Sequence, residues 1–291
     1  MSDKPEKRRI LIQLDPDAQA SSFDRVVAVD AGVDEIFSYG GVALDQVQGL
    51  VHGAIFTRGL ADLRFTAIFV GGSDVGVGEE MLRRVRGSFL GPLCVSVMLD
   101  ANGANTTAAA AVLAARKHVN LAGTTAVVLG GTGPVGQRAA RLLGREGATV
   151  RLCSRSEQRA GAAAEAINKA LGDKRVSPCI AGDEASLKKA LGGAAVVIAA
   201  GAAGVELLPA SVLQAIPSLK VAIDLNAVPP AGVGGVKVMD KGADLGAVKA
   251  YGAIGVGGTK MKIHKAAVAG LFEVNNRVFD AEEIFELGKT L

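Results

Sequence analysis

Residues 126–136 read AVVLGGTGPVG, an apolar run that passes through a glycine-rich turn into the start of a helix-forming stretch. Gly131, Gly133 and Gly136 have the G-x-G-x-x-G spacing of dinucleotide-binding turns, which stand between a strand and a helix. There the first glycine permits the bend, the second lets the backbone approach the pyrophosphate, and the third allows close packing of the helix. The alternative is that the glycines only shape a loop, in a chain that holds 38 of them. The context favours a dinucleotide, bound by Gly131, Thr132, Gly133, Pro134, Val135 and Gly136.

The segment after the next expected strand, residues 149–153, indicates which dinucleotide binds. It reads SRSEQR from Ser154 to Arg159, where an NAD enzyme usually places a carboxylate for the ribose 2′-hydroxyl. An arginine instead offers a planar fork that matches phosphate oxygens. We therefore predict NADP, with NAD as a weaker substitute because Glu157 could still bind the ribose. The alternative is that the arginines are solvated, although cations at a helix start oppose the helix dipole. The expected contacts are Ser154, Arg155, Ser156 and Arg159.

Composition excludes several classes of function. With 291 residues, the chain is long enough for two domains that share a cleft. Its net charge of +3 comes from residues spread along the chain, without the basic, aromatic patches typical of nucleic-acid binding. Cys94, Cys153 and Cys179 are scattered and lack metal-ligand spacing. No apolar run reaches the roughly 20 residues that span a bilayer, and the charged N-terminus does not resemble a signal peptide. We expect a soluble, cytoplasmic protein that binds no metal, nucleic acid or membrane.

The spacing of apolar runs predicts an α/β fold. Short β-like runs stand at residues 10–14, 25–29, 66–70 and 93–99, which is typical of a largely parallel, buried sheet. A helix is predicted at residues 78–86. Further strands at 125–129, 149–153, 195–199 and 221–225 alternate with helices that include 135–146 and 157–171. This alternation predicts a Rossmann-type, right-handed doubly wound sheet.

Two other stretches set the domain boundaries. Residues 105–117 are alanine-rich after Asn-Thr-Thr, which predicts a capped helix that connects two domains. Near the C-terminus we predict a glycine-rich loop at 252–258, a helix at 260–272 and a last helix opened by Asp280 and Glu283 as a capping box. The expected NADP domain is residues 107–259. The expected substrate domain, also α/β, is residues 1–106 completed by the C-terminal helices at 260–291.

Four segments resemble one family of enzymes. Residues 99–109, 131–136, 224–230 and 252–264 are similar to those of the NADP-dependent methylene-tetrahydromethanopterin dehydrogenases of methylotrophic and related bacteria, and the likeness runs nearly end to end. It implies oxidation of the methylene group of a C1-carrying pterin to the methenyl form, in one-carbon metabolism, by a homo-oligomer that the likeness suggests is a trimer. Some members accept the tetrahydrofolate analogue, and members differ in accepting NAD. Ser154 and Ser156 depart from the expected glycine and lysine, which leaves the relative use of NADP and NAD open.

The resemblance places Lys260 beside the pterin, as the catalytic candidate. Hydride loss from a carbon between two nitrogens leaves a cation that their lone pairs stabilise, so we expect positioning and electrostatics in place of an acid–base pair. A cation beside that carbon would oppose the reaction, so Lys260 is assigned to a polar group of the pterin or its tail. The alternative is a solvated lysine, which Lys262 resembles more closely. His264 shares the helix face of Lys260 and is either a substrate contact or a structural histidine.

Other candidates follow the ends of expected strands. Asp15 and Asp17 could accept the paired N–H donors of a pterin, or they could be turn residues. Substrate contacts are also expected from the segment between the domains, where the alternative is helix capping: Asp100, Asn102, Asn105 and Thr106. The remaining cofactor contacts are expected near the ribose, the nicotinamide and the glycine-rich loop: Ala200, Gly201, Asn226, Gly255 and Gly257.

Two rival functions remain. The first is a folate-specific methylene dehydrogenase of similar build. The bifunctional folate enzymes carry a tyrosine and a lysine for cyclohydrolase activity on one helix, and neither Tyr39 nor Tyr251 has that setting. The second is a non-catalytic NADP-sensing module, which would need the turn but no second cleft. The Asn-Thr-Thr segment and the glycine-lysine segment argue against it.

Overall fold

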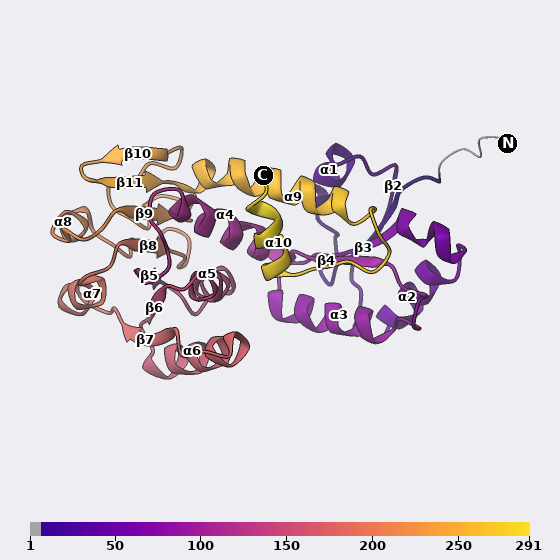
Figure 1. Ribbon diagram of the computed structural model, residues 1–291, viewed down its shortest axis with the longest axis horizontal. Coiled ribbons are helices and arrows are strands. Elements are labelled where there is room, and N and C mark those ends of the chain that lie inside the picture. Colours follow the sequence, from indigo (N-terminus) through magenta and orange to yellow (C-terminus); the bar gives the residue numbers. More distant parts are fainter. Residues whose placement is uncertain (1–6) are drawn as a thin grey trace. The chain divides into compact units, whose positions relative to one another are not determined.

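The glycine-rich turn joins strand β5 (Thr125–Leu129) to helix α5 (Pro134–Arg145), which leads to strand β6 (Thr149–Ser154) in the computed structural model. The structure describes residues 7–291, and the charged residues 1–6 lie outside it. The chain divides into two units (Figure 1). A seven-stranded unit is formed by Thr107–Lys260, and a five-stranded unit combines the chain up to Thr106 with Met261–Leu291. The chain passes between them within α4 (Ala104–Arg116) and α9 (Ala253–Gly270).

The seven-stranded sheet has the order β10-β11-β9-β8-β5-β6-β7. Its other strands are β7 (Val176–Ile180), β8 (Val196–Ala199), β9 (Val221–Asp224), β10 (Lys241–Leu245) and β11 (Val248–Tyr251). Only the β10–β11 pair among them is antiparallel. If the antiparallel edge strand β10 is left out, the strands from β7 to β11 stand third, second, first, fourth, fifth and sixth along the chain, which is the Rossmann order. The α/β, Rossmann-type fold is confirmed.

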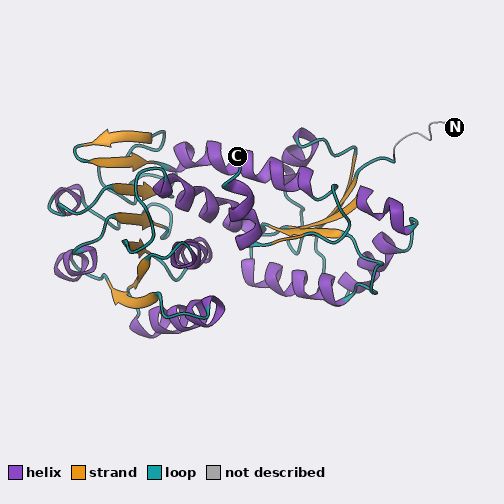
Figure 2. Cartoon of the chain, viewed as in Figure 1, coloured by secondary structure: helices purple, strands orange, loops and turns teal. Residues whose placement is uncertain are grey.

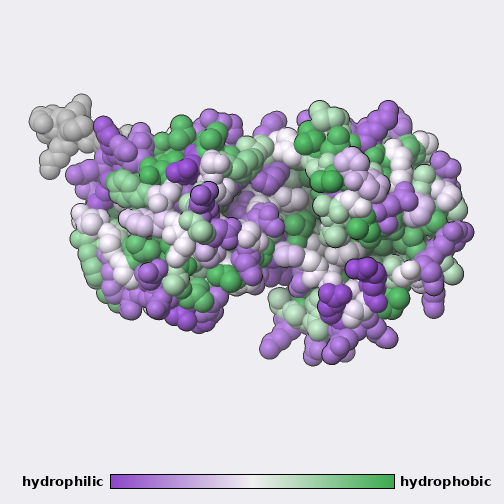
Figure 3. All heavy atoms as spheres, turned by 180° about the vertical axis from the view of Figure 1, so that it is seen from behind, coloured by the Kyte–Doolittle hydropathy of each residue, from purple (hydrophilic) through white to green (hydrophobic). Residues whose placement is uncertain are grey.

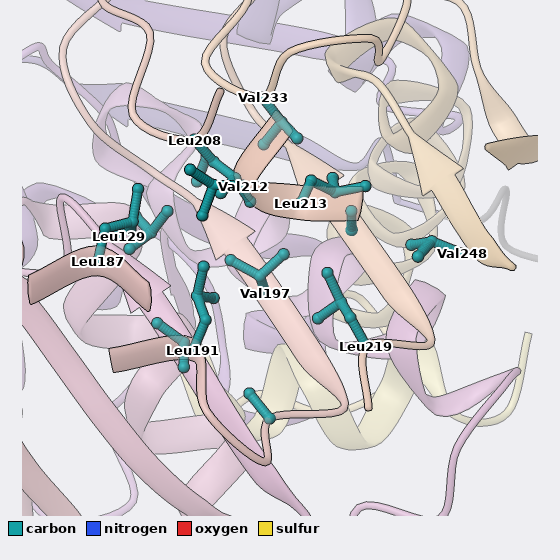
Figure 4. Close-up of a cluster of buried hydrophobic side chains, with 14 of the residues drawn as sticks. Leu129, Leu187, Leu191, Val197, Leu208, Val212, Leu213, Leu219, Val233 and Val248 are labelled. Carbon is teal, nitrogen blue, oxygen red and sulfur yellow. The ribbon is translucent and has the colours of Figure 1, made fainter. Parts of the chain in front are cut away.

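Helices cover both faces of this sheet (Figure 2). Helices α5 and α6 (Glu157–Leu171) pack together on one face, and α7 (Glu184–Leu191) and α8 (Ala210–Gln214) lie on the other. Beneath α7 and α8, the alternate strand residues that face them form a buried apolar cluster, which includes Leu129 and Val197 (Figure 4). This core holds β5 and β8 in place at the point where the strand order reverses, where dinucleotide folds bind their ligand.

The five-stranded sheet has the order β12-β4-β3-β1-β2 and is parallel throughout. Its strands are β1 (Ile10–Leu14), β2 (Glu35–Tyr39), β3 (Thr66–Val70), β4 (Ser96–Leu99) and β12 (Val278–Phe279). Its helical segments are α1 (Ser22–Asp30), α2 (Val47–Ile55), η1 (Leu60–Phe65), α3 (Val75–Gly87), η2 (Ala101–Gly103) and α10 (Ala281–Gly288). The last of these begins with the predicted capping box between Asp280 and Glu283. The C-terminal segment therefore supplies a strand as well as a helix to this unit.

The strand predicted at residues 25–29 is wrong, because this segment lies within α1. The hydroxyl of Ser21 accepts a hydrogen bond from the amide of Asp24 and caps the helix. Val27 and Ala28 are buried, whereas Val26 and Val29 are more than 60% exposed. The valines favour a strand locally, but the cap and the packing of one face on the sheet decide for a helix.

Five strands were absent from the sequence prediction, and all but β11 lie at sheet edges: β2, β7, β10, β11 and β12. The edge strands β2 and β7 show why. β2 is flanked only by β1, and β7 only by β6. Each carries exposed residues, and Pro178 interrupts the apolar pattern of β7. Edge strands tolerate proline and polar residues because one of their two sides makes no hydrogen bonds to a neighbouring strand. Their residues therefore lack the continuous apolar run that identifies a buried strand.

The loop predicted at residues 252–258 is also wrong, because α9 already begins at Ala253. A Cβ atom on Gly252 would lie 2.1 Å from the carbonyl oxygen of Lys237, and one on Gly255 would lie 1.7 Å from that of Asp240. The glycines therefore let the first turn of the helix pack directly on the backbone before β10. On the face that Figure 3 shows, each unit carries a mixture of apolar and polar residues.

Candidate functional site

The turn after β5 presents main-chain donors at the start of α5 that have no hydrogen-bond acceptor within residues 7–291. Gly133 is the N-cap residue of α5 and has no side chain that could cap the helix. Pro134 follows at the first helical position. The next amides, of Val135 and Gly136, precede the first intrahelical hydrogen bonds. The turn itself is held by a 2.9 Å bond from the amide of Gly131 to the carbonyl of Cys153, and Gln137 Nε2 donates to the carbonyl of Thr132 at 2.8 Å. This geometry can bind an anion at the helix N-terminus.

The three glycines of the motif differ in the space that surrounds them. A Cβ atom on Gly131 would lie 2.6 Å from Cδ1 of Leu152, and one on Gly136 would lie 2.7 Å from Cα of Gly131. Both positions are therefore closed by packing. A Cβ atom on Gly133, in contrast, would meet no protein atom closer than 3.7 Å. The space beside Gly133 is therefore available to a ligand that approaches the backbone.

Gly130 shapes the turn and was not singled out by the sequence analysis. Its φ of +63° lies in the left-handed region, and a Cβ atom there would lie 2.4 Å from Cα of Gly201. Gly131 has no positive φ, so the sharp bend belongs to Gly130 and not to the first glycine of the motif. The doublet Gly-Gly after an apolar run was the available signal. Ala200 and Gly201 follow β8 and border the turn, because the amide of Ala200 donates to the carbonyl of Leu129.

Arg155 and Arg159 are exposed at the start of α6, immediately after β6. Within residues 7–291, neither guanidinium has a hydrogen-bond or ion-pair partner. Ser156 is the N-cap of α6, and its hydroxyl accepts from the amide of Arg159 at 3.3 Å. The buried hydroxyl of Ser154 accepts from the amide of Ser156 at 3.2 Å. The two serines thus build the corner, and the arginines place two positive charges beside it.

Asn226 organises the loop after β9. Its side-chain oxygen accepts from the amide of Val228 at 2.9 Å, and its Nδ2 donates to the carbonyl of Pro230 at 2.8 Å. The buried carboxylate of Asp224 closes the same loop by accepting from the amides of Gly232 and Val233. The side chain of Asn226 is therefore used within the loop, and its contact with nicotinamide stays a prediction.

The residues of the C-terminal segment predicted to bind cofactor or substrate lie on α9. Gly255 has a packing reason to be glycine, whereas a Cβ atom on Gly257 would meet nothing within 4 Å. Lys260 is partly buried and Lys262 is exposed. The roles predicted for Gly255, Gly257 and Lys260 stay predictions.

In the five-stranded unit, Asp15 and Asp17 organise two loops at the carboxyl end of the sheet. The buried carboxylate of Asp15 accepts from the amides of Asp17 and Ser21. The carboxylate of Asp17 accepts from the amide and the hydroxyl of Ser73, both at 2.9 Å. These bonds join the loop after β1 to the loop after β3. They support the alternative that both aspartates act as turn residues, and a contact with the pterin stays a prediction.

Asp100 caps the first turn of α4. Its Oδ1 accepts from the amides of Asn105 and Thr106 at 3.0 Å, and its Oδ2 accepts from the hydroxyl of Thr106 at 2.6 Å. Nδ1 of His264 lies 3.8 Å from the same Oδ2. All four side chains are at most 1% exposed. The structure thus brings four predicted substrate residues together as a buried polar cluster, which supports the capping alternative for Asn105 and Thr106.

His264 packs against aromatic rings in this cluster. Its ring is stacked on Phe69 with a centroid distance of 5.6 Å, and the ring of Phe23 lies 6.3 Å away. The imidazole is fully buried. This packing supports the structural role for His264.

Asn102 differs from its neighbours because it is exposed and strained. Its φ of +52° is the only positive value among the described non-glycine residues, and its amide donates to the carbonyl of Gly72. Strained backbone outside glycine concentrates at functional sites. Of the predicted substrate residues in this segment, Asn102 has the most accessible side chain.

Two further findings concern residues 7–291. No helix there is both long enough and apolar enough to cross a membrane. Three or more histidine, cysteine or acidic side chains nowhere gather there into a metal-binding group.

Comparisons with known proteins agree on one family. A family model described as methylene-tetrahydromethanopterin dehydrogenase, N-terminal, matches residues 22–102. The bifunctional protein MdtA of Methylorubrum extorquens is 47% identical over 286 residues, which cover 98% of this chain and 99% of that protein. The NAD(P)-dependent methylenetetrahydromethanopterin dehydrogenase of the same organism is 36% identical over 262 residues, with coverages of 87% and 88%.

The fold is also found in solved structures of distant sequence. Quinate dehydrogenase from Corynebacterium glutamicum in complex with NAD is 16% identical, with a TM-score of 0.54 over 98% of this chain and all of that one. At this identity, the likeness shows the shared fold alone.

Proposed function

Since this chain belongs to the methylene-tetrahydromethanopterin dehydrogenase family, we propose that it transfers a hydride from the methylene group of methylene-tetrahydromethanopterin to NADP, giving the methenyl form. The turn from Gly130 to Gly136 carries the cofactor half of this proposal, because it combines an uncapped helix start with open space beside Gly133. The 36% identical relative is NAD(P)-dependent. The activity therefore requires a dinucleotide and a C1-carrying pterin.

Preference for NADP over NAD is proposed from Arg155 and Arg159. A planar guanidinium can donate two parallel hydrogen bonds to the oxygens of one phosphate. Both guanidinium groups are exposed here and have no partner within residues 7–291. An incoming 2′-phosphate would also offset the unfavourable position of cations at a helix N-terminus. Glu157 stands between them in sequence and can bind a ribose hydroxyl, so NAD is proposed as a weaker substitute.

The five-stranded unit is proposed as the substrate domain. The family match at residues 22–102 falls within it. At the carboxyl end of its sheet, the carboxylate of Asp17 accepts from the amide and hydroxyl of Ser73, and the carbonyl of Gly72 accepts from the amide of Asn102. Strand carboxyl ends line the ligand crevice in open α/β sheets. The seven-stranded unit, with the turn and Arg155, is proposed as the NADP domain.

The reaction requires the protein to bind and orient NADP and the pterin, and it requires no proton transfer. Bound NADP supplies the hydride acceptor. The nitrogens on either side of the methylene carbon stabilise the cation that hydride loss leaves, so no general base is needed. The turn holds the pyrophosphate and Arg155 holds the 2′-phosphate, while Lys260 binds a polar group of the pterin away from the reacting carbon. Rate enhancement then comes from positioning the reactants at about 3 to 3.5 Å.

One assay tests the activity. Purified protein is mixed with NADP and methylene-tetrahydromethanopterin, and the absorbance of reduced cofactor is followed. Turnover is expected, and its absence with every C1 carrier would refute the enzyme assignment. The same assay with methylene-tetrahydrofolate tests the alternative substrate, and faster turnover there would reassign the chain to folate. NADP binding without turnover on either carrier would favour the sensing module.

A homo-oligomer, of which a trimer is the suggested size, and a cytoplasmic location complete the proposal. Phe23, Val26 and Val29 recur at helical spacing on α1 and are 50%, 62% and 61% exposed. An apolar helix face of this kind is typical of an interface. Light scattering after size-exclusion chromatography gives the subunit number, and a monomer at micromolar concentration would contradict the proposal. Fractionation of the source cells tests the location, and recovery of the protein in a membrane or secreted fraction would contradict it.

A further inference from the structure

Two cysteines lie side by side in the seven-stranded sheet. Cys153 on β6 and Cys179 on β7 are directly paired in the parallel register, so their side chains leave the same face of the sheet. Neighbouring strands lie about 4.8 Å apart, which is within the roughly 4.4–6.8 Å between Cα atoms that a disulfide spans. Both cysteines are thiols in the structure. The register alone therefore permits a disulfide between β6 and β7.

The two thiols have unequal environments. Cys153 is 1% exposed and belongs to the apolar cluster beneath α7. Burial, together with the adjoining Cys179 thiol, raises the pKa of Cys153 well above its ordinary value. Cys179 is partly exposed and lines a cavity of about 540 Å³ that is open to reagents. Of the pair, Cys179 is therefore the thiol that an oxidant can reach first.

A positive charge lies beside the pair. Arg151 precedes Cys153 by two residues on the same strand face and lines the same cavity. Its guanidinium is fixed by hydrogen bonds to the carbonyls of Ala190 and Gly192, at 2.7 and 2.6 Å. Lys189 lines the cavity too. The cavity that Cys179 lines therefore contains two cations, Arg151 and Lys189, beside one carboxylate, Glu157.

We propose that Cys153 and Cys179 form a reversible oxidation site in which a peroxide attacks at Cys179 and Cys153 completes a disulfide. The Cys179 thiolate attacks one oxygen of hydrogen peroxide, the O–O bond breaks, and hydroxide leaves to give a sulfenic acid. The sulfur of Cys153 then attacks that of Cys179. The S–S bond forms, the S–O bond breaks, and the thiol proton leaves with the hydroxyl group as water. Two electrons pass from the two sulfurs to the peroxide.

The site lies next to the cofactor turn, so oxidation changes cofactor affinity. The carbonyl of Cys153 is the acceptor that holds the amide of Gly131, and residues 154–156 follow directly on β6. A disulfide draws the two Cβ atoms to about 3.8 Å, which shifts this end of β6 relative to the turn. This consequence rests on the proposed NADP function, whereas formation of the disulfide does not.

The experiment uses the full chain in a Cys94→Ser background, so that only the two paired thiols remain. Treatment with hydrogen peroxide is expected to remove both titratable thiols, and a dithiol reductant is expected to restore them. Non-reducing peptide mapping by mass spectrometry is expected to find the Cys153 and Cys179 peptides joined within one chain. Wild-type protein, mapped in parallel, keeps the test valid if a variant fails to fold. Unreacted thiols, or a disulfide between two chains, would overturn the proposal.

Single variants assign the order of reaction. Cys153→Ala should leave Cys179 as its sulfenic acid, trapped by a dimedone-type reagent, and Cys179→Ala should leave Cys153 unreacted under the same treatment. The reverse pattern would overturn the assigned roles. NADP titration of the oxidised and reduced protein is expected to show a severalfold higher dissociation constant after oxidation. An equal constant would overturn the coupling, and no NADP binding by the reduced protein would instead refute the proposed function.

Discussion

The amide of Gly131 and the carbonyl of Cys153 are joined by a 2.9 Å hydrogen bond. This bond fixes the turn from Gly130 to Gly136 to the end of β6, two residues before Arg155. This main-chain hydrogen bond therefore fixes the position of the uncapped start of α5 relative to the segment that carries Arg155. The proposed contacts with the pyrophosphate and with the 2′-phosphate therefore depend on the same short piece of backbone.

Replacement of Arg155 by alanine should weaken the binding of NADP and leave the binding of NAD nearly unchanged. A charge-assisted hydrogen bond contributes about 1.5–3 kcal/mol, so the KM for NADP should rise roughly 10- to 100-fold. Steady-state kinetics with both cofactors measures this. Arg175→Ala is the matched control, because Arg175 is exposed and paired with Asp173. Equal increases for NADP and NAD would refute the phosphate contact.

Gly136→Ala should disturb the turn, because the new Cβ atom would lie 2.7 Å from Cα of Gly131. Overpacking of this kind costs about 1–3 kcal/mol, so both the free energy of unfolding and NADP affinity should fall. Gly161→Ala on α6 is the control, because a Cβ atom there meets nothing within 4 Å. That variant should gain roughly 0.5–1 kcal/mol in stability. Urea denaturation and NADP titration give both quantities, and equal behaviour of the two variants would contradict the packing argument.

Lys260→Ala should raise the KM for the pterin more than that for NADP. The reason is its proposed contact with a polar group of the pterin, at a distance from the reacting carbon. Lys262→Ala is the control, since Lys262 lies two residues further along α9 and is exposed. Kinetics at saturating NADP separates the two constants. If the two variants match the wild type equally well, Lys260 does not contact the pterin.

His118 should make the stability of the protein depend on pH. Its Nε2 lies 2.7 Å from the hydroxyl of Tyr251, and burial, with the charges of Lys249 and Lys117, lowers the pKa of His118 below 6.5. The unfolded chain then binds the proton first as the pH falls. Stability should therefore decline from about pH 6.5 downwards, as far as the lower folded pKa.

His118→Gln should reduce this dependence, because the variant has no imidazole to titrate. The measurement is the urea midpoint at about pH 7.5 and pH 5.5 for both proteins. Other groups titrate in both proteins, so the difference between the two slopes is the informative quantity. A slope that does not change on substitution would show that His118 has the same pKa in the folded and unfolded chains.

Local pattern determined much of this protein. Apolar runs located β1, β3, β5, β6, β8 and β9, and the cap at Asp280 located the last helix, because periodicity and capping act over a few residues. The glycine spacing, with its strand and helix, indicated a dinucleotide before any contact was known. Resemblance of whole segments, which sums many weak local signals, indicated the pterin.

Tertiary structure decided what depends on partners distant in sequence. Taken by themselves, residues 25–29 favour a strand. They nevertheless lie within α1, because a cap and a buried face stabilise the helix. Gly130 matters because Gly201 approaches it, and Gly255 because the backbone of Asp240 does. Asp100, Thr106 and His264 share a buried cluster that no sequence spacing reveals. The pairing of Cys153 with Cys179 follows from strand register, which is set by packing across the whole sheet and not by either cysteine's neighbours.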